Sequence, residues 1–508
     1  MIARARMVPA ALVLALVAWL EACGPVPAPR PPAPPPISAE LADRSCRDIW
    51  QQELLRPIDP PALRDCVARF LAGATGEAVR ASVRASAEWK DKHPPTPPAP
   101  VYQARPGLVR ASGAGLEDDA GPRLFVGTSL FWSLWGELHD RARLDANLEA
   151  IAKTGAVDFI RVFAQVGGAS WADRAVGPAD PGWKDAIRSL TDRAYDRYGL
   201  RVEWTILAWA DGLPTKESRA AAVDGVLEAL DGRAAKVFAI EIANEGFANG
   251  PDPLEAKQLA GRVRARFPGL VATSAPQGDS CEAQAPWYAG AGASLVTLHF
   301  DRSVNGAGGY WRPVRQPWRE SVSSCDGLPR AYLSNEPIGP GSSVAADDEP
   351  IRLVANAAVS FVAAVGAYVL HTDAGIRGGG AADLARGRVA NVWQVSRWLE
   401  TTAGLKALRA ALPPDLARWA RAPSSKPPMF EVREFNVTVD RVYCTTAGPR
   451  FVCVAFNLRP SSTFTAKRGM AVRVVHPLTG AELEARTLAA GDTITIGGDP
   501  GAVVLVGQ

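Results

Sequence analysis

The sequence predicts an α/β chain built on a (β/α)8 barrel, with a small all-α domain before the barrel and a β-sandwich after it. Eight apolar strand-like runs alternate with amphipathic segments between residues 124 and 410. Two proline-rich stretches set a helical segment apart, and short alternating runs follow residue 428. Because 508 residues exceed one ordinary core, several domains are expected.

The first residues have the order of a secretory signal. Arg4 and Arg6 precede an apolar run from Val8 to Leu20, which is too short to span a membrane as an ordinary helix. The ending Leu-Glu-Ala-Cys23 resembles a bacterial lipobox, which implies that residues 1–22 are removed and Cys23 is lipidated. The alternative is a plain cleaved signal in which Cys23 has no role.

Two proline-rich spacers bound the next segment. The stretch from Pro25 to Pro36 contains eight prolines in twelve residues, and a second stretch follows His93. Both are expected to be extended and semi-rigid. We therefore divide this part into a linker over residues 23–36, a small helical domain over 37–92 and a second linker over 93–123.

The helical segment resembles a small domain, distantly like phycobilisome linkers, that recurs in secreted bacterial proteins. The resemblance rests on Ile49-Trp-Gln-Gln-Glu-Leu-Leu, on Pro60-Pro-Ala-Leu and on the run from Val79 to Trp89. It implies attachment or interaction rather than catalysis.

The barrel is predicted over residues 124–410. Leu144, Leu148 and Ile151 share one helix face between the first two strands, and Asp252 followed by Pro253 is typical of a helix start. Eight such repeats match the period of a (β/α)8 barrel, whereas a doubly wound sheet requires a glycine-rich phosphate loop that is missing here. The strand-like runs begin at Leu124, Phe159, Val202, Val237, Leu270, Leu295, Ala331 and Ala367.

The tail over residues 428–508 is predicted to be a β-sandwich, because short alternating runs are separated by Gly, Pro, Asn and Asp turns. Its His476-Pro-Leu-Thr-Gly segment looks like a turn found in sandwich modules that follow glycosidase barrels. This implies packing against the barrel or weak ligand binding.

Charge and cysteine content restrict the environment of the chain. With 56 Lys and Arg against 53 Asp and Glu, nothing favours a nucleic-acid partner. Six cysteines other than Cys23 fall as neighbours, which favours disulfides formed outside the cytoplasm, although six cysteines allow 15 connectivities. The pairs expected from proximity are Cys46 with Cys66, Cys281 with Cys325, and Cys444 with Cys453.

Two Asn-Glu pairs close predicted strands of the barrel. Asn244-Glu245 ends the fourth strand and Asn335-Glu336 ends the seventh, 336 − 245 = 91 residues later. Functional groups of such barrels stand at the carboxyl ends of strands, and retaining glycosidases use two carboxyl groups. The pair resembles that of the retaining glycosidase clan that includes family 5 cellulases and mannanases. The resemblance implies Glu336 as nucleophile and Glu245 as acid/base, with like-charge repulsion favouring the protonated form of Glu245.

The same resemblance implies further site residues. Arg161 on the second strand would orient the nucleophile and keep it ionised, Asn244 would bond a sugar hydroxyl, and His299 would lie beside the nucleophile. Many clan members carry a Trp after the eighth strand, where this sequence has His371 instead. We expect other tryptophans near strand ends to stack on sugar rings, namely Trp132, Trp209 and Trp311.

No cofactor is expected, and the five histidines show no spacing of metal ligands. The predicted partner is a poly- or oligosaccharide, with membrane attachment through a lipid anchor only, in the periplasm or at the surface of a bacterial cell. Two alternatives remain, a carbohydrate-binding or adhesion lipoprotein with a degenerate barrel and a transglycosylase acting on cell-wall glycan. The sequence does not determine the polysaccharide or the oligomeric state.

Overall fold

A computed structural model describes most of the chain. The described residues are 38–54, 57–88, 102–278, 280–305, 309–319, 325–337, 349–371, 396–421, 427–433, 442–458, 461–497 and 501–508. The predicted signal, Cys23 and both proline-rich stretches lie outside them. The chain divides into two compact units, residues 1–99 and 100–508. Within the described residues, no helix is long and apolar enough to cross a membrane.

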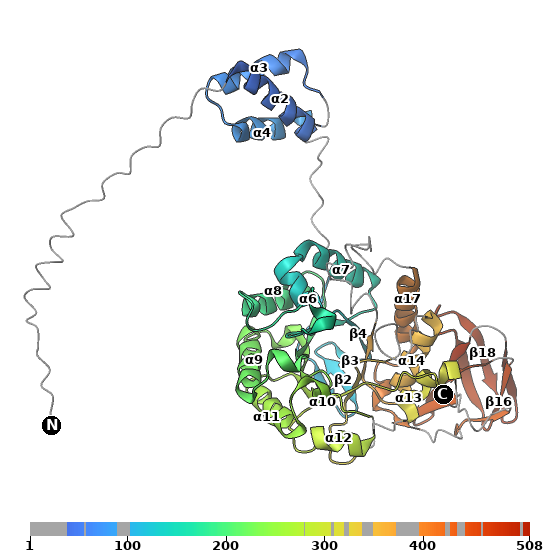
Figure 1. Ribbon diagram of the computed structural model, residues 1–508. Coiled ribbons are helices and arrows are strands. Elements are labelled where there is room, and N and C mark those ends of the chain that lie inside the picture. Colours follow the sequence, from blue (N-terminus) through green and yellow to red (C-terminus); the bar gives the residue numbers. More distant parts are fainter. Residues whose placement is uncertain are drawn as a thin grey trace, which may run out of the picture. The chain divides into compact units, whose positions relative to one another are not determined.

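The first unit is a three-helix domain made of α2 (Ala39–Leu54), α3 (Pro60–Leu71) and α4 (Gly76–Ala85) (Figure 1). Two helices begin at side-chain caps, because Asp59 accepts from the amide of Ala62 and Thr75 from that of Ala78. The Cys46–Cys66 disulfide joins α2 to α3. A core this small gains much of its stability from such a cross-link.

The second unit contains the predicted barrel. Eight parallel strands lie in the order β8-β7-β6-β5-β4-β11-β10-β9. The first and last strands of this order, β8 and β9, are linked by hydrogen bonds just before β9 begins. There the amides of Ser294 and Leu295 donate to the carbonyl of Val271 at 2.9 and 3.2 Å. The strands are β4 (Phe125–Ser129), β5 (Phe159–Phe163), β6 (Arg201–Leu207), β7 (Val237–Ala243), β8 (Leu270–Ser274), β9 (Val296–Leu298), β10 (Tyr332–Ser334) and β11 (Ala367–Leu370).

Helices between successive strands cover the barrel (Figure 1). The strands read as continuous apolar runs because side chains on both faces are buried. Gly127 allows close packing, since a Cβ there would lie 2.3 Å from the ring of Phe159. The helices are α6 (Ser133–His139), α7 (Arg141–Thr154), α8 (Trp183–Asp196), α9 (Lys216–Ala229), α10 (Gly246–Asn249), α11 (Pro253–Arg264), α12 (Cys281–Tyr288), α13 (Arg312–Arg319), α14 (Pro350–Val362) and α17 (Ser396–Ala411).

Helix boundaries follow the sequence signals. The helix α7 ends at Gly155, whose φ of 62° suits glycine. The side chain of Asp252 caps α11 by accepting from the amide of Glu255 at 2.8 Å. The Glu255 carboxylate pairs instead with Arg219 on α9, so it serves packing between helices rather than the cap.

The expected linker over residues 93–123 contains structure that the sequence analysis missed. Three short antiparallel strands, β1 (Arg110–Ser112), β2 (Gly115–Asp118) and β3 (Gly121–Arg123), lie at the amino ends of the barrel strands. Asp118 on β2 pairs with Arg201, the first residue of β6, and Leu116 packs in the barrel core. The segment thus closes the end of the barrel opposite the site.

The carboxyl-terminal region is the predicted β-sandwich. A six-stranded antiparallel sheet runs β12-β14-β15-β20-β17-β18, and a three-stranded sheet runs β13-β16-β19. The first sheet packs on the barrel, so that Val452, Val454 and Val504 belong to the barrel core. The strands are β12 (Ala420–Arg421), β13 (Phe430–Arg433), β14 (Val442–Ala447), β15 (Arg450–Phe456), β16 (Ser461–Ala466), β17 (Met470–Val475), β18 (Glu482–Leu488), β19 (Thr493–Gly497) and β20 (Ala502–Gly507).

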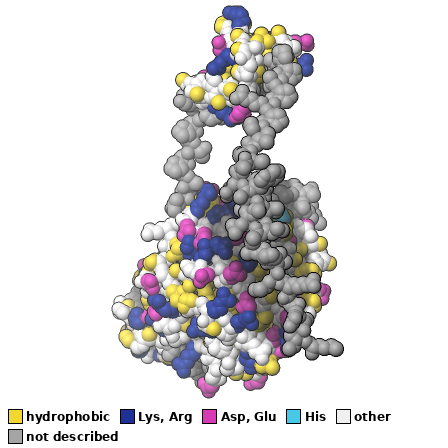
Figure 2. All heavy atoms as spheres, turned by 90° about the vertical axis from the view of Figure 1, so that its left-hand side faces the viewer, with side chains coloured by type: hydrophobic (Ala, Val, Ile, Leu, Met, Phe, Trp, Pro, Cys, Tyr) yellow, Lys and Arg dark blue, Asp and Glu magenta, His cyan; other side chains and the backbone are white. Residues whose placement is uncertain are grey.

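All three predicted disulfides are present. Cys281 begins α12 and Cys325 precedes β10, so their disulfide joins a helix start to the segment before a barrel strand. Cys444 and Cys453 join β14 to β15. Three disulfides are typical of a chain folded in an oxidising compartment outside the cytoplasm. On the face of the second unit drawn in Figure 2, acidic and basic side chains are interspersed.

Candidate active site

The two Asn-Glu pairs lie together at the carboxyl ends of the barrel strands. Glu245 follows β7 in a left-handed conformation with φ of 48°, which is uncommon for a residue other than glycine. The chain turns sharply here because Gly246 donates its amide to Ser274 Oγ at 2.7 Å and leaves no room for a side chain against Trp287. Non-glycine residues at such angles cluster at functional sites.

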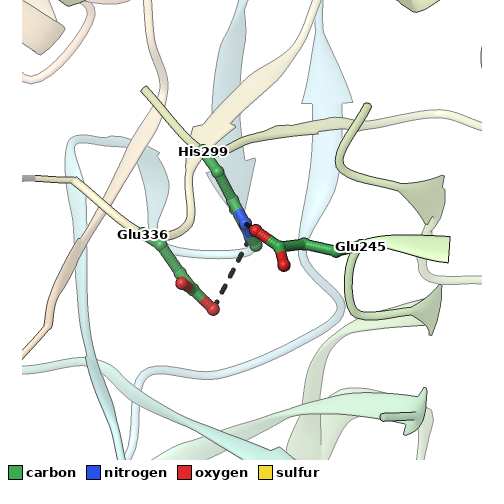
Figure 3. Close-up of side chains that lie close together, drawn as sticks. All are labelled: Glu245, His299 and Glu336. Carbon is green, nitrogen blue, oxygen red and sulfur yellow. Dashed lines mark hydrogen bonds and ion pairs between the residues drawn. The ribbon is translucent and has the colours of Figure 1, made fainter. Parts of the chain in front are cut away.

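His299 lies between the two glutamates (Figure 3). It follows β9, and its Nδ1 is 2.9 Å from Glu245 Oε1, while its Nε2 is 3.7 Å from Glu336 Oε1. One atom from each of the three side chains lies within 4.8 Å of the other two. The side chain of Glu245 is 34% exposed, whereas that of Glu336 is 10% exposed. One carboxylate therefore meets the solvent and the other is enclosed.

Arg161 binds Glu336, the more deeply buried of the two glutamates. Its guanidinium donates through Nη1 to Glu336 Oε1 at 2.8 Å and through Nη2 to Glu241 Oε2 at 2.8 Å. The same Nη2 donates to Asn244 Oδ1 at 2.8 Å. Arg161 is fully buried, so these charge-assisted bonds fix the orientation of Glu336.

Sequence reasoning missed two acids that lie deeper in the barrel. Glu241 on β7 accepts from Thr205 Oγ1 at 2.7 Å and from Asn335 Nδ2 at 3.1 Å. Glu203 on β6 is buried, with one oxygen 3.7 Å from Arg161 Nε. The available signal was a glutamate inside an otherwise apolar strand run, because a buried carboxylate requires a partner.

These neighbours set the charge states. Burial opposes ionisation of Glu336, but the imidazoles of His299 and His371, when protonated, and the guanidiniums of Arg161 and Arg302 hold its pKa well below the usual range. Burial likewise opposes the charge of Arg161, whose pKa is nevertheless raised by Glu241, Glu336 and Glu203. The nucleophile candidate and its arginine are therefore both charged at neutral pH.

Glu203 responds differently. Burial raises its pKa to about 8; the positive charge of Arg161 opposes this rise, and the negative charges of Glu241 and Glu336 add to it. At neutral pH this carboxyl group is mostly protonated. The proton on Glu203 therefore leaves one negative charge fewer beside Arg161.

No protein-family model matches the sequence, and no curated protein is significantly similar to it. Solved structures are similar in fold. A glycoside hydrolase family 5 protein from Bacteroides vulgatus has a TM-score of 0.57 at 13% identity, over 79% of this chain and 93% of the other. A protein described as a glycoside hydrolase has a TM-score of 0.55 at 14% identity, over 79% of this chain and 96% of the other.

The chain has the fold of the barrel glycoside hydrolases. The resemblance inferred from the strand ends is confirmed at the level of architecture, including the sandwich that follows the barrel. At this identity the likeness shows the fold alone, so any activity depends on the side chains described above.

The end of the eighth strand carries a histidine rather than a tryptophan. His371 follows β11 and is buried, and its Nδ1 is 2.9 Å from Ser129 Oγ. Burial lowers the pKa of His371 to about 3, so the ring is neutral near pH 7. Its Nε2 is 3.8 Å from Glu336 Oε2, and Arg302 Nη2 lies 3.4 Å from the same oxygen. Arg302 and Ser129 were not predicted.

The three tryptophans expected to bind sugar lie in different surroundings. Trp132 is fully buried in the barrel core. It directly precedes α6, and most residues of this helix are buried as well. Trp311 stacks on Phe456 of the sandwich, with centroids 5.7 Å apart, and therefore joins the two parts of the unit. Trp209, which follows β6, is partly exposed. It remains a candidate for a sugar contact.

Glu245, His299 and Glu336 also form the one group among the described residues whose atoms are close enough to hold a metal ion. Spacing along the sequence does not reveal the group, because its members come from three different strands. His299 Nδ1 is already within hydrogen-bond distance of Glu245, so two of the possible ligand atoms face each other.

Proposed function

We propose that the chain is a retaining glycoside hydrolase that cleaves β-glycosidic bonds of a poly- or oligosaccharide. The observation that carries the proposal is the approach of the Glu245 and Glu336 oxygens to within 4.8 Å. Retaining enzymes place their carboxyl groups about 5 to 5.5 Å apart, whereas inverting enzymes need roughly 6.5 to 9.5 Å for a water molecule.

The roles of the two acids follow from their surroundings. Glu336 is enclosed, ionised and oriented by Arg161, as an attacking carboxylate must be. Glu245 is partly exposed and bonded to His299, so it can meet both a leaving group and water. One structural neighbour is described as a glycoside hydrolase of family 5, which is consistent with a carbohydrate substrate.

The reaction then proceeds in two displacements. A Glu336 oxygen forms a bond to the anomeric carbon while the bond to the leaving oxygen breaks, and Glu245 gives that oxygen its proton. Water then attacks the glycosyl-enzyme, Glu245 takes the proton from water, and Glu336 leaves as a carboxylate. Arg161 keeps its two bonds throughout, because Glu241 anchors its second nitrogen.

The test uses each glutamate in turn. Glu336→Ala should abolish turnover, and azide should restore part of it as a glycosyl azide of inverted configuration. Glu245→Ala should slow substrates with poor leaving groups far more than activated aryl glycosides, and azide should give a retained product. Product configuration is read by NMR during hydrolysis of a polysaccharide panel.

The competing function is a carbohydrate-binding lipoprotein without turnover. It is favoured by the lack of a tryptophan after the eighth strand, where His371 stands. Binding of a glycan with no hydrolysis by the wild-type chain, together with unchanged binding by Glu336→Ala, would support that alternative and contradict the enzyme.

We further propose that lipidation of Cys23 anchors the chain to a bacterial membrane. The proposal rests on the lipobox-like ending before Cys23 and on the proline-rich stretch after it. The expected result is a membrane-bound wild type whose amino-terminal peptide carries a diacylglyceryl mass, and a Cys23→Ser chain that is released. A Cys23→Ser chain that stays membrane-bound would contradict the anchor.

A further inference from the structure

A pocket lies where the sandwich meets the end of the barrel domain, and it shares no residue with the candidate active site. Its volume is about 540 Å³. The floor is formed by strands β17, β18 and β20 of the six-stranded sheet, and the wall by Pro413, Trp419 and Arg450. A pocket of this size accommodates a small organic molecule such as a disaccharide.

The lining is strongly basic. Arg450, Arg473 and Arg486 line the pocket, and no aspartate or glutamate does. Gln508 also lines the pocket, and its main-chain oxygen accepts from the amide of Ala471 at 3.0 Å. Three guanidiniums around one cavity favour a ligand with negative charge.

Arg450 is arranged as a receptor for an anion. Its guanidinium stacks over the ring of Trp419, with Cζ 4.6 Å from the centroid. Stacking occupies the face of the guanidinium but leaves its N–H groups, which lie in the plane, free to bond a carboxylate at two points. Among the described residues, no carboxylate forms an ion pair with Arg450.

The other two arginines are only loosely held. Arg473 lies 3.8 Å from Glu482, and Arg486 lies 3.2 Å from Glu484. Both arginine side chains are about half exposed, and exposed pairs of this kind contribute little. They can therefore turn to a ligand at small cost.

Trp419 fixes the position of Arg450 at the pocket. Its ring is 6% exposed and belongs to the hydrophobic core of the unit, so the aromatic face on which the Arg450 guanidinium stacks is held in place.

We propose that this pocket binds a saccharide that carries carboxylates, such as a chain of uronic acid units. That the ligand is a saccharide rests on the proposed function, whereas its negative charge rests on the pocket alone. The sandwich then holds an acidic glycan on the same unit as the barrel, and the enzyme acts on acidic polysaccharides or on chains that contain acidic units.

The test compares a galacturonate disaccharide with its methyl ester, which removes the charge and keeps the sugar. We expect the full chain to bind the acid at least about tenfold more tightly than the ester in calorimetry. Arg450→Gln should abolish this preference. Arg468→Gln is the matched control, because Arg468 is exposed on the same domain, outside the pocket, and bonds the carbonyl of Pro449.

Equal binding of acid and ester, or a preference that survives Arg450→Gln in a folded chain, would overturn the proposal. Competition by inorganic sulfate at the same concentration as the disaccharide would identify a general anion site and would overturn the saccharide assignment. Arg486→Gln provides a second variant in case Arg450→Gln loses its fold.

Failure of the pocket and failure of the proposed function give different results. A chain that hydrolyses glycans but binds the acid no more tightly than the ester would contradict only the proposal for the pocket. The opposite result is a chain that binds the acid more tightly, loses this preference in Arg450→Gln and hydrolyses no glycan. It would support the pocket and contradict only the proposed enzymatic activity.

Discussion

At the scale of single residues, Arg161 determines the charge balance of the barrel mouth. It bonds Glu336 and Glu241 at 2.8 Å and lies 3.7 Å from Glu203. One guanidinium cannot compensate three enclosed carboxylates, because an unpaired buried charge costs several kcal/mol. Because Glu203 holds a proton, it carries no negative charge. Arg161 then has to compensate only the two acids that it bonds.

Glu203→Gln should therefore stabilise the chain in a way that depends on pH. The carboxyl group holds its proton up to about pH 8 when folded, but only to about pH 4.5 when unfolded. As pH rises through this interval, the wild type loses stability relative to the variant by up to about 1.4 kcal/mol per pH unit. Below pH 4.5 the difference should be constant. Urea unfolding from pH 4 to pH 8 measures it.

Glu228→Gln is the control for this experiment. Glu228 is exposed on α9, where it pairs with Lys184, so its removal should change stability little. A difference between Glu203→Gln and wild type that does not vary with pH would show that Glu203 is ionised in the folded chain.

At the scale of elements, tryptophans that lie near strand ends pack against different parts of the unit. Trp209 follows β6 and is partly exposed, and Gly167 and Gly212 leave room for its ring. Trp311 precedes α13 and packs on Phe456 of β15. Similar tryptophans near strand ends therefore have different partners.

Replacing the two tryptophans should separate binding from stability. Trp209→Ala should raise KM for an oligosaccharide roughly tenfold with a small change in kcat, because stacking on the sugar is lost. Trp311→Ala should leave KM unchanged and lower the free energy of unfolding by about 2 kcal/mol, because a packed ring is lost. Steady-state kinetics and urea unfolding measure both. A raised KM in Trp311→Ala alone would reverse the assignment.

At the scale of the whole molecule, hydrophobic cores define what folds together. The barrel and the inner sheet of the sandwich share one core, which includes Tyr443 and Phe456. The helical domain has a separate core around Cys46, Ile49 and Phe70. The chain is therefore expected to unfold in at least two steps.

Removing the disulfide of the helical domain should affect only that domain. The double variant Cys46→Ser, Cys66→Ser should lose about 3 kcal/mol from the small domain, since the bond closes a loop of 20 residues. Differential scanning calorimetry should show the transition of residues 102–508 unchanged, with unchanged turnover. A shift of the main transition would show that the two units stabilise each other.

The sequence by itself determined the order of the domains, the eight strands and the two Asn-Glu pairs, and the nearness of the cysteines along the chain predicted the disulfides that the structure contains. These are local signals, because strand runs, caps and neighbouring cysteines lie within short stretches of chain. The position of Glu245 and Glu336 at strand ends followed from counting strands.

Only the tertiary structure decided how distant residues meet. Glu203, Glu241, Arg302 and His371 surround the site from different strands, and no spacing along the chain brings them together. The burial of Trp132 and the stacking of Trp311 on the sandwich also depend on packing between elements. Burial and charge depend on all neighbours in space, whereas sequence patterns report only neighbours along the chain.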